Sequence, residues 1–225
     1  MKIKIIMSFI ALLLASCSCA IERDNKQAGK KTTKTIVVND FTEIQIAGGF
    51  NVYFTQANNT SVKIRGHEKA LKNVNIVSDG KTLTIGTKKS WKFLSFYDSD
   101  IDVYVTSPNL RSVSIAGSGE FKSSTKIDTD RMYISVAGSG EVDIQDIICD
   151  NLKGEIAGSG EIDIKRITTP NAELSIAGSG DIDIENAVID NVACEIAGSG
   201  NIELKGNIRH HTQEIAGSGS VNINQ

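Results

Sequence analysis

Aromatic residues are scarce in this chain, and none follows Tyr133. They make up 5% of the 225 residues. A globular β-sandwich core usually depends on such large side chains, whereas a thin core of stacked β-branched residues does not need them. The scarcity therefore favours a slender, repetitive β-structure over a globular sandwich.

A long apolar segment is also lacking. The longest run, Ile5 to Leu14, is interrupted by Ser8. A membrane-spanning helix needs about 20 apolar residues, so this run is too short to cross a bilayer. Its length is typical of the apolar part of a signal peptide, and Lys2 and Lys4 supply the basic residues that precede one.

The apolar run ends in Leu14-Ala15-Ser16-Cys17, which resembles a bacterial lipobox. We therefore predict that residues 1–16 are a lipoprotein signal peptide and that Cys17 is lipidated. The alternative is an ordinary cleaved signal peptide followed by a bystander cysteine. Two or three acyl chains give stable membrane anchoring. Ser18 occupies the position where an inner-membrane retention signal has Asp, so we expect an outer-membrane lipoprotein that faces the periplasm or the cell exterior.

The chain has no strong charge of either sign. Its net charge is −3, and removing two lysines with residues 1–16 makes it −5. A mildly acidic protein has no electrostatic attraction for nucleic acid. Residues 17–34 are polar and aperiodic after the cysteine, and we interpret them as a flexible tether. Residues 35–225 remain as one elongated β domain.

An internal repeat dominates the second half of the chain. The tetrapeptide Ala-Gly-Ser-Gly occurs six times, and a variant copy lies upstream at residues 47–50. The six copies begin at Ala116, Ala137, Ala157, Ala177, Ala197 and Ala216. Apolar and polar residues alternate on both sides of each copy, which is typical of half-buried strands. The glycines allow the sharp corner between these strands.

Units of about 20 residues cannot each bury an apolar face, so they must stack on one another. Stacking predicts three inward ladders of equivalent residues. These are Val142, Ile162, Ile182, Ile202 and Val221; Ile144, Ile164, Ile184, Leu204 and Ile223; and Ile115, Val136, Ile156, Ile176, Ile196 and Ile215. A fourth is predicted at Ile127, Ile148, Val188 and Ile208, and an asparagine ladder at Asn151, Asn171 and Asn191.

We predict an all-β fold: a single-chain parallel β-helix or solenoid-like stack with rungs of about 20 residues in 111–225. Residues 35–110 form a less regular β-rich part, with a hairpin at Asp79-Gly80 and a short helical turn in 66–73. An antiparallel meander, in which each tetrapeptide is a hairpin loop, is the competing architecture. Cys149 and Cys194 occupy different lateral positions two rungs apart, so we expect both to be unpaired.

The layout resembles the putative auto-transporter adhesin, head-GIN domain family of Bacteroidota lipoproteins. The matching segments are FTEIQIAGGFNVYF, the hairpin around DGKTLTI, VYVTSPNLRSVSIAGSG and the later GSG units. They cover residues 36–225. The resemblance implies an all-β stack and a role in adhesion, and it brings no catalytic residues.

The motifs of familiar enzymes are lacking as well. Gly-Ser-Gly has the wrong spacing for a hydrolase nucleophile elbow, and no Gly-Lys-[Ser/Thr] follows to make a phosphate loop. Two acidic ladders are predicted on the outward face: Glu141, Glu161, Asp181 and Asn201; and Asp143, Asp163, Asp183 and Glu203. A solvated, anti-aggregation face is the favoured interpretation, and weak cation or cationic-ligand binding is the alternative. We predict no metal site, including at His210-His211, and no cofactor.

One segment stands out as a candidate ligand site. Within nine residues the chain has four aromatic side chains: Trp91, Phe93, Phe96 and Tyr97. One interpretation is that they bind a ligand, by stacking on sugar rings or anchoring a partner. The alternative is that they cover the open sheet or cap the solenoid core. We therefore expect a non-enzymatic envelope lipoprotein, either an adhesin or surface binding module for a glycan or protein, or a structural envelope component. An enzyme acting on glycans is a distant alternative. The oligomeric state is not indicated by the sequence.

Overall fold

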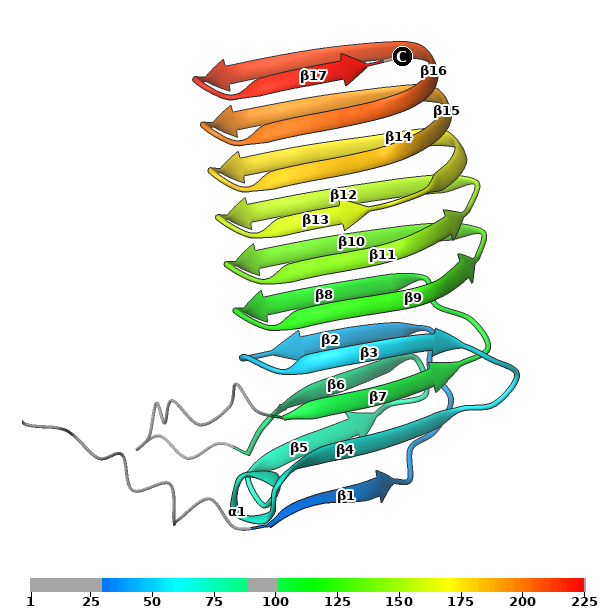
Figure 1. The fold of residues 1–225 in the computed structure, drawn as a ribbon, viewed down its shortest axis with the longest axis vertical. Helices are drawn as coiled ribbons and strands as arrows, with labels where there is room; N and C mark the ends of the chain where they lie inside the picture. The colour runs from blue at the N-terminus through cyan, green and yellow to red at the C-terminus, as the bar shows by residue number, and fades with distance from the viewer. Residues whose placement is uncertain (1–29, 89–100, 225) are drawn as a thin grey trace, which may run out of the picture.

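A computed structural model of the protein describes residues 30–88 and 101–224, and the second half is a parallel β-solenoid of about 6 turns with rungs of about 20 residues. Each rung contains two strand segments joined by an Ala-Gly-Ser-Gly corner, and the corners lie above one another along one edge (Figure 1). The strands are β8 (Ser112–Gly117), β9 (Glu120–Asp128), β10 (Arg131–Gly138), β11 (Glu141–Ile148), β12 (Asn151–Gly158), β13 (Glu161–Ile164), β14 (Ile167–Gly178), β15 (Asp181–Gly198), β16 (Asn201–Gly217) and β17 (Ser220–Asn224). All pairings among them are parallel, so the solenoid prediction is confirmed and the meander is wrong for this part.

The corner sequence is explained by how closely the rungs approach each other. Gly178 has a φ of +138°, and a Cβ there would overlap the carbonyl oxygen of Gly158 in the rung below. The same Gly158 oxygen accepts a hydrogen bond from the backbone N–H of Ser179 at 2.8 Å. Only glycine combines the left-handed backbone with this contact.

The upstream variant copy forms a rung of the same solenoid. β2 (Glu43–Ala47) and β3 (Asn51–Gln56) stack in parallel on β8 and β9, with Ala47 opposite Ala116. The intervening chain adds strands on the other side of this rung, where β6 (Thr82–Thr87) pairs with β2 and β7 (Asp102–Ser107) pairs with β3.

The end of the stack next to β6 and β7 is covered by antiparallel elements. They are β1 (Lys31–Ile36), β4 (Ser61–His67), the short helix α1 (Glu68–Leu71) and β5 (Val74–Ser78). β1 pairs with β4, β4 with β7, and β5 with β6, all antiparallel. The turn at Asp79-Gly80 joins β5 to β6, which confirms the predicted hairpin, and α1 confirms the predicted helical turn.

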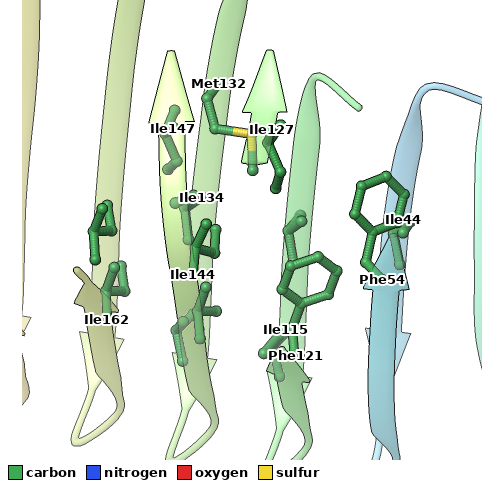
Figure 2. Packing of buried hydrophobic residues seen from close by; sticks show 14 of the residues in the cluster. Ile44, Phe54, Ile115, Phe121, Ile127, Met132, Ile134, Ile144, Ile147 and Ile162 are labelled. Atoms are coloured by element: carbon green, nitrogen blue, oxygen red, sulfur yellow. The ribbon is translucent and has the colours of Figure 1, made fainter. Parts of the chain in front are cut away.

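The core is a single column of aliphatic side chains between the two faces of the solenoid, with Phe54 and Phe121 stacked at a centroid distance of 6.0 Å (Figure 2). The first three predicted ladders are confirmed strand by strand. The last residue of the third ladder, Ile215, is 40% exposed because its rung ends the stack on that side. The asparagine ladder is also confirmed, because Asn171 donates to Asn151 at 3.5 Å and Asn191 donates to Asn171 at 3.3 Å.

The fourth predicted ladder is wrong, because its members belong to three different rows. Ile127 stacks on Ile147 and Ile167 inside the core. Ile148 and Val188 point outward and are 39% and 52% exposed. Register shifts between Ser123 and Lys126, and between Ile184 and Ala187, accommodate rungs longer or shorter than 20 residues, so counting forward from each corner fails beyond them.

The two described cysteines are buried and unpaired, as predicted. Cys194 lies in the core directly above Leu174. Cys149 lies at the corner opposite the glycine turns, in the short connection between β11 and β12.

Candidate binding surface

The outward face of the sheet that contains β3, β7, β9 and β11 has an ordered row of side chains. Because successive strands pair in register, one residue from each strand lies beside its neighbours in this row. From the covered end onward it consists of Lys63, Tyr104, Tyr53, Lys122, Asp143, Asp163, Asp183 and Glu203. We call it the outer row. It begins with an aromatic pair and continues as the predicted acidic ladder.

Tyr53 and Tyr104 form a stacked pair across the parallel strands β3 and β7. Their ring centroids are 5.3 Å apart and their planes differ by 20°. A separation of this size means that the rings are offset rather than eclipsed, which is the preferred arrangement of aromatic pairs. Tyr104 is 39% exposed. Part of the pair therefore remains available to a ligand.

Polar groups surround the tyrosine pair. Asn51 donates a hydrogen bond from Nδ2 to Oδ1 of Asp102 at 3.4 Å on the neighbouring row. The pKa of Tyr53 is raised, first by burial and then by the negative charges of Asp102 and Glu120. The phenol therefore remains protonated at neutral pH and acts as a hydrogen-bonding group.

Lys122 separates the tyrosines from the acidic part of the outer row. Its ammonium group lies 2.5 Å from Oε1 of Glu120 and 3.9 Å from Oε1 of Glu141. The pKa of Lys122 is raised, mainly by the hydrogen bond with Glu120. The positive charge is therefore fixed at the junction and partly neutralised by its neighbours.

Three carboxylates form the densest part of the acidic ladder. One oxygen each from Glu161, Asp163 and Asp183 lies within 4.8 Å of the others. The pKa of all three groups is raised, first by partial burial and then largely by repulsion from neighbouring carboxylates. Calcium takes six to eight oxygen ligands. Three carboxylates supply only part of such a ligand set. The expectation of no dedicated metal site stays a prediction.

The opposite outward face and the corner remote from the glycine turns each carry an open groove. A groove of about 400 Å³ runs over the alanines that precede the corners, and Glu155 lies at its side. Tyr133 donates a hydrogen bond to Oε2 of Glu155 at 2.5 Å. A second groove, of about 450 Å³, lies at the corner opposite the glycine turns and includes Cys149. Burial raises the pKa of the Cys149 thiol, which makes it a poor nucleophile.

Several predicted site residues lie outside the described residues. Cys17 and the aromatic segment with Trp91, Phe93, Phe96 and Tyr97 belong to this group. Both assignments therefore remain predictions. His210 and His211 lie on β16 beside Asn191 and Val192, and within residues 30–88 and 101–224 no metal-ligand cluster includes them.

The tyrosine pair is the feature that sequence reasoning missed. A signal for it was present, because NVYFT at 51–55 and DVYVT at 102–106 share their pattern. In the structure the two segments pair residue for residue. Comparing these segments as two copies of one strand would have placed the tyrosines side by side.

Comparison with known families supports the architecture. Residues 40–223 match the family model described as "Putative auto-transporter adhesin, head GIN domain". The chain belongs to this family. The earlier resemblance is thereby confirmed, and the match extends from just before β2 into β17 in this head GIN domain.

Solved structures share the head GIN fold. A putative adhesin from Bacteroides fragilis has 23% identity and a TM-score of 0.66, covering 86% of this chain and 97% of its own. A putative lipid binding protein from Parabacteroides distasonis has 25% identity and a TM-score of 0.70, covering 88% and 98%. A putative adhesin from the same species has 23% identity and a TM-score of 0.60, covering 87% and 97%.

No curated protein matches the chain. Within the part that the structure describes, no helix has the length and apolar character needed to cross a membrane. The family and the fold therefore define the class of protein, while the ligand has to be inferred from the surface.

Proposed function

We propose that this protein is a non-enzymatic binding module of the cell envelope, held at the outer membrane by lipidated Cys17. The observation that supports binding best is the partly exposed Tyr53–Tyr104 pair on the outward sheet face. Both tyrosines lie on strands of the solenoid, so their positions are fixed before a ligand arrives. Preorganised aromatic groups on rigid elements are typical of binding sites.

The ligand class that we propose is a glycan or a protein displayed in the envelope. Offset tyrosine rings offer an apolar face to a sugar ring or an aliphatic side chain, and Asn51 and Asp102 offer hydrogen bonds beside them. Nucleic acid is excluded from the proposal, because the acidic ladder continues directly from this surface. The proposal includes no cofactor.

The chemistry of the described surface supports a non-catalytic role. General acid–base catalysis requires two groups in different environments, whereas the carboxylates Glu161, Asp163 and Asp183 share one environment and their pKa values shift in the same direction. The core is filled by buried side chains along its length. An internal pocket for an acyl chain therefore has no support in this part of the protein.

Glycan and envelope-protein arrays test the binding role. We expect the mature chain to bind a subset of ligands, and Tyr53→Ala with Tyr104→Ala to reduce that binding at least about tenfold, as for removal of a contact hot spot. Tyr133→Ala, on the opposite face, is the matched control and should leave binding unchanged. Equal loss in both variants, or retained binding in the tyrosine-pair variant, would refute this site. Absence of any ligand would favour the structural alternative.

Cell fractionation tests the anchor separately. Cys17→Ala should move the protein from the membrane fraction to the soluble fraction, because the acyl chains provide the stable attachment. Protease treatment of intact cells then distinguishes a periplasmic from an external orientation. An unchanged membrane fraction for Cys17→Ala would overturn the proposed localisation.

A further inference from the structure

The small net charge of the chain conceals a strong separation of charge along the solenoid. Residues 30–88 contain nine lysines and arginines against four aspartates and glutamates, a net charge of +5. Residues 101–224 contain nine basic residues against 19 acidic ones, a net charge of −10. The first segment includes all the elements that cover one end of the stack, and the second includes all the rungs beyond β3 (Figure 1).

The basic residues of the covered end are exposed. They lie on β1, β4, α1 and the loops beside β6, and they include Lys34, Lys63, Arg65, Lys69, Lys72 and Lys81. Two of them have acidic partners, since Lys72 lies 3.8 Å from Glu68 and Lys81 lies 2.9 Å from Glu43. Asp102 of β7 lies opposite Arg65 and adds a fifth acidic residue to this end. Five acidic residues do not balance nine basic ones, so this end keeps a net positive charge. We call it the basic end.

The charge is spread over the end rather than focused on a point. Lys34 lies on β1, opposite the inward-facing Ile64 of β4. Lys63 and Arg65 lie on the outward face of β4, opposite Tyr104 and Asp102 of β7. Lys69 lies on the helix that follows β4. A single small anion would contact only one or two of them. A flat array of phosphate groups would contact many at once, because lysine and arginine each bind phosphate through strong charged hydrogen bonds.

We infer that the basic end docks onto an anionic lipid headgroup surface, with the solenoid projecting away from it. The chemistry of the surface, a plane of phosphate groups, is what the distribution of lysine and arginine complements. β1 begins at Lys31, only 14 positions after Cys17 in the sequence, so an acylated Cys17 holds this same end near the bilayer. This last step rests on the proposed anchor, whereas the charge complementarity does not.

The acidic rungs determine the orientation. Strands are about 4.8 Å apart, so β12 lies about 19 Å beyond β6 along the stack. That distance is more than two Debye lengths at physiological salt, where one Debye length is about 8 Å. When the basic end faces the membrane, the acidic rungs are therefore screened from it. A solenoid lying flat would bring carboxylates such as Glu161 and Asp181 against the same phosphates, and repulsion would disfavour that pose.

Vesicle binding by the unacylated mature chain tests this inference without the anchor. The protein is the mature chain with Cys17→Ser, and the vesicles are either pure phosphatidylcholine or an equal mixture with phosphatidylglycerol. We expect cosedimentation with the anionic vesicles only, and release when the salt concentration is raised to about 0.5 M, which shortens the Debye length. Binding to both vesicle types, or to neither, would overturn the inference.

Two variants with the same change in net charge locate the contact. The first replaces Lys34, Lys63, Arg65 and Lys69 by Gln, and the second replaces Lys153, Lys165, Lys205 and Arg209 by Gln. Each basic residue near an anionic surface contributes about fivefold in affinity. The affinity of the first variant for the anionic vesicles should therefore fall at least about a hundredfold. The second should change binding by less than about threefold, because its residues lie beyond the screening distance.

Equal losses in the two variants would show that only net charge matters and would overturn the inference. Circular dichroism and thermal unfolding show whether each variant is folded. If one variant does not fold, the vesicle experiment with the Cys17→Ser protein, which keeps all eight basic residues, still decides: without release at high salt, the inference fails. These outcomes are independent of Cys17→Ala fractionation. A failed anchor and a failed docking surface therefore give different results.

Discussion

The glycine corners give a sharp prediction, since two buried glycines of this solenoid differ in what surrounds them. A Cβ on Gly160 would lie 2.7 Å from the carbonyl oxygen of Gly140 and 2.5 Å from Cγ1 of Val136. A Cβ on Gly154 would meet only flexible side-chain ends, the nearest being Cδ2 of Leu174 at 3.1 Å. Neither glycine has a positive φ. Replacing either by alanine therefore tests only whether there is room for the added methyl group, without backbone strain.

The magnitude follows from the spacing between rungs. The Gly140 oxygen that a Cβ on Gly160 would approach also accepts a hydrogen bond from the backbone N–H of Glu161 at 3.0 Å. Relieving the overlap requires a shift of about 0.5 Å, which stretches this bond to about the limit for hydrogen bonding. A lost buried hydrogen bond costs about 1 kcal/mol and overpacking a further 1–3 kcal/mol. We expect Gly160→Ala to destabilise the fold by about 2–4 kcal/mol.

Urea and thermal unfolding of the mature chain measure this difference. Gly154→Ala should stay within about 1 kcal/mol of the parent, because a leucine side chain can move and alanine reduces the entropy of the unfolded chain. Since 1 kcal/mol corresponds to about 2–4 °C in a protein of this size, Gly160→Ala should lower Tm by about 4–16 °C. If the two variants are equally stable, the close approach of backbone at the corners is not what demands glycine.

Two further predictions concern ionisable groups. The pKa values of Glu161, Asp163 and Asp183 are raised in the fold, so the folded state binds more protons than the unfolded state between the ordinary carboxyl pKa and the raised one. Stability should therefore fall as pH rises through that window, and Asp163→Asn should flatten the dependence of Tm on pH; a slope that is unchanged in the variant would contradict this. Burial raises the pKa of the Cys194 thiol to about 11, so a thiol reagent at neutral pH should modify it only after denaturation. Labelling of Cys194 in the folded protein would show that the last rungs open.

Much of the solenoid was predictable because the repeat fixes which residues share a row. Val142 and Ile162 stack as expected since their distances from the preceding corners are equal. Ile127 and Ile147 were harder to match because their rungs differ in length. Counting back from the following corner solves this, since each lies ten residues before the next Ala-Gly-Ser-Gly alanine. In the longer rung the extra residue is accommodated between Ser123 and Lys126, before Ile127. The sequence alone does not show whether an extra residue lies before or after the inward-facing isoleucine.

The candidate surface was less predictable, because its first part depends on contacts between distant segments. The acidic ladder follows from the repeat and was expected. The Tyr53–Tyr104 pair depends on β7 stacking beside β3 after an excursion through β4, α1, β5 and β6. The basic end has the same origin: its residues are scattered through the first 88 positions and gather only when antiparallel strands cover one end.

The outer row shows why such a fold can change its ligand without changing its architecture. Tyr53 lies between the buried residues Val52 and Phe54, just as Asp143 lies between Val142 and Ile144. The inward neighbours in both rungs are large and apolar, whereas the outward residues differ completely in chemistry. Because side chains alternate along a strand, the core constrains every second residue and leaves the others free. Substitutions in the outer row should therefore alter binding far more than stability, and substitutions of Val52 or Val142 should do the reverse.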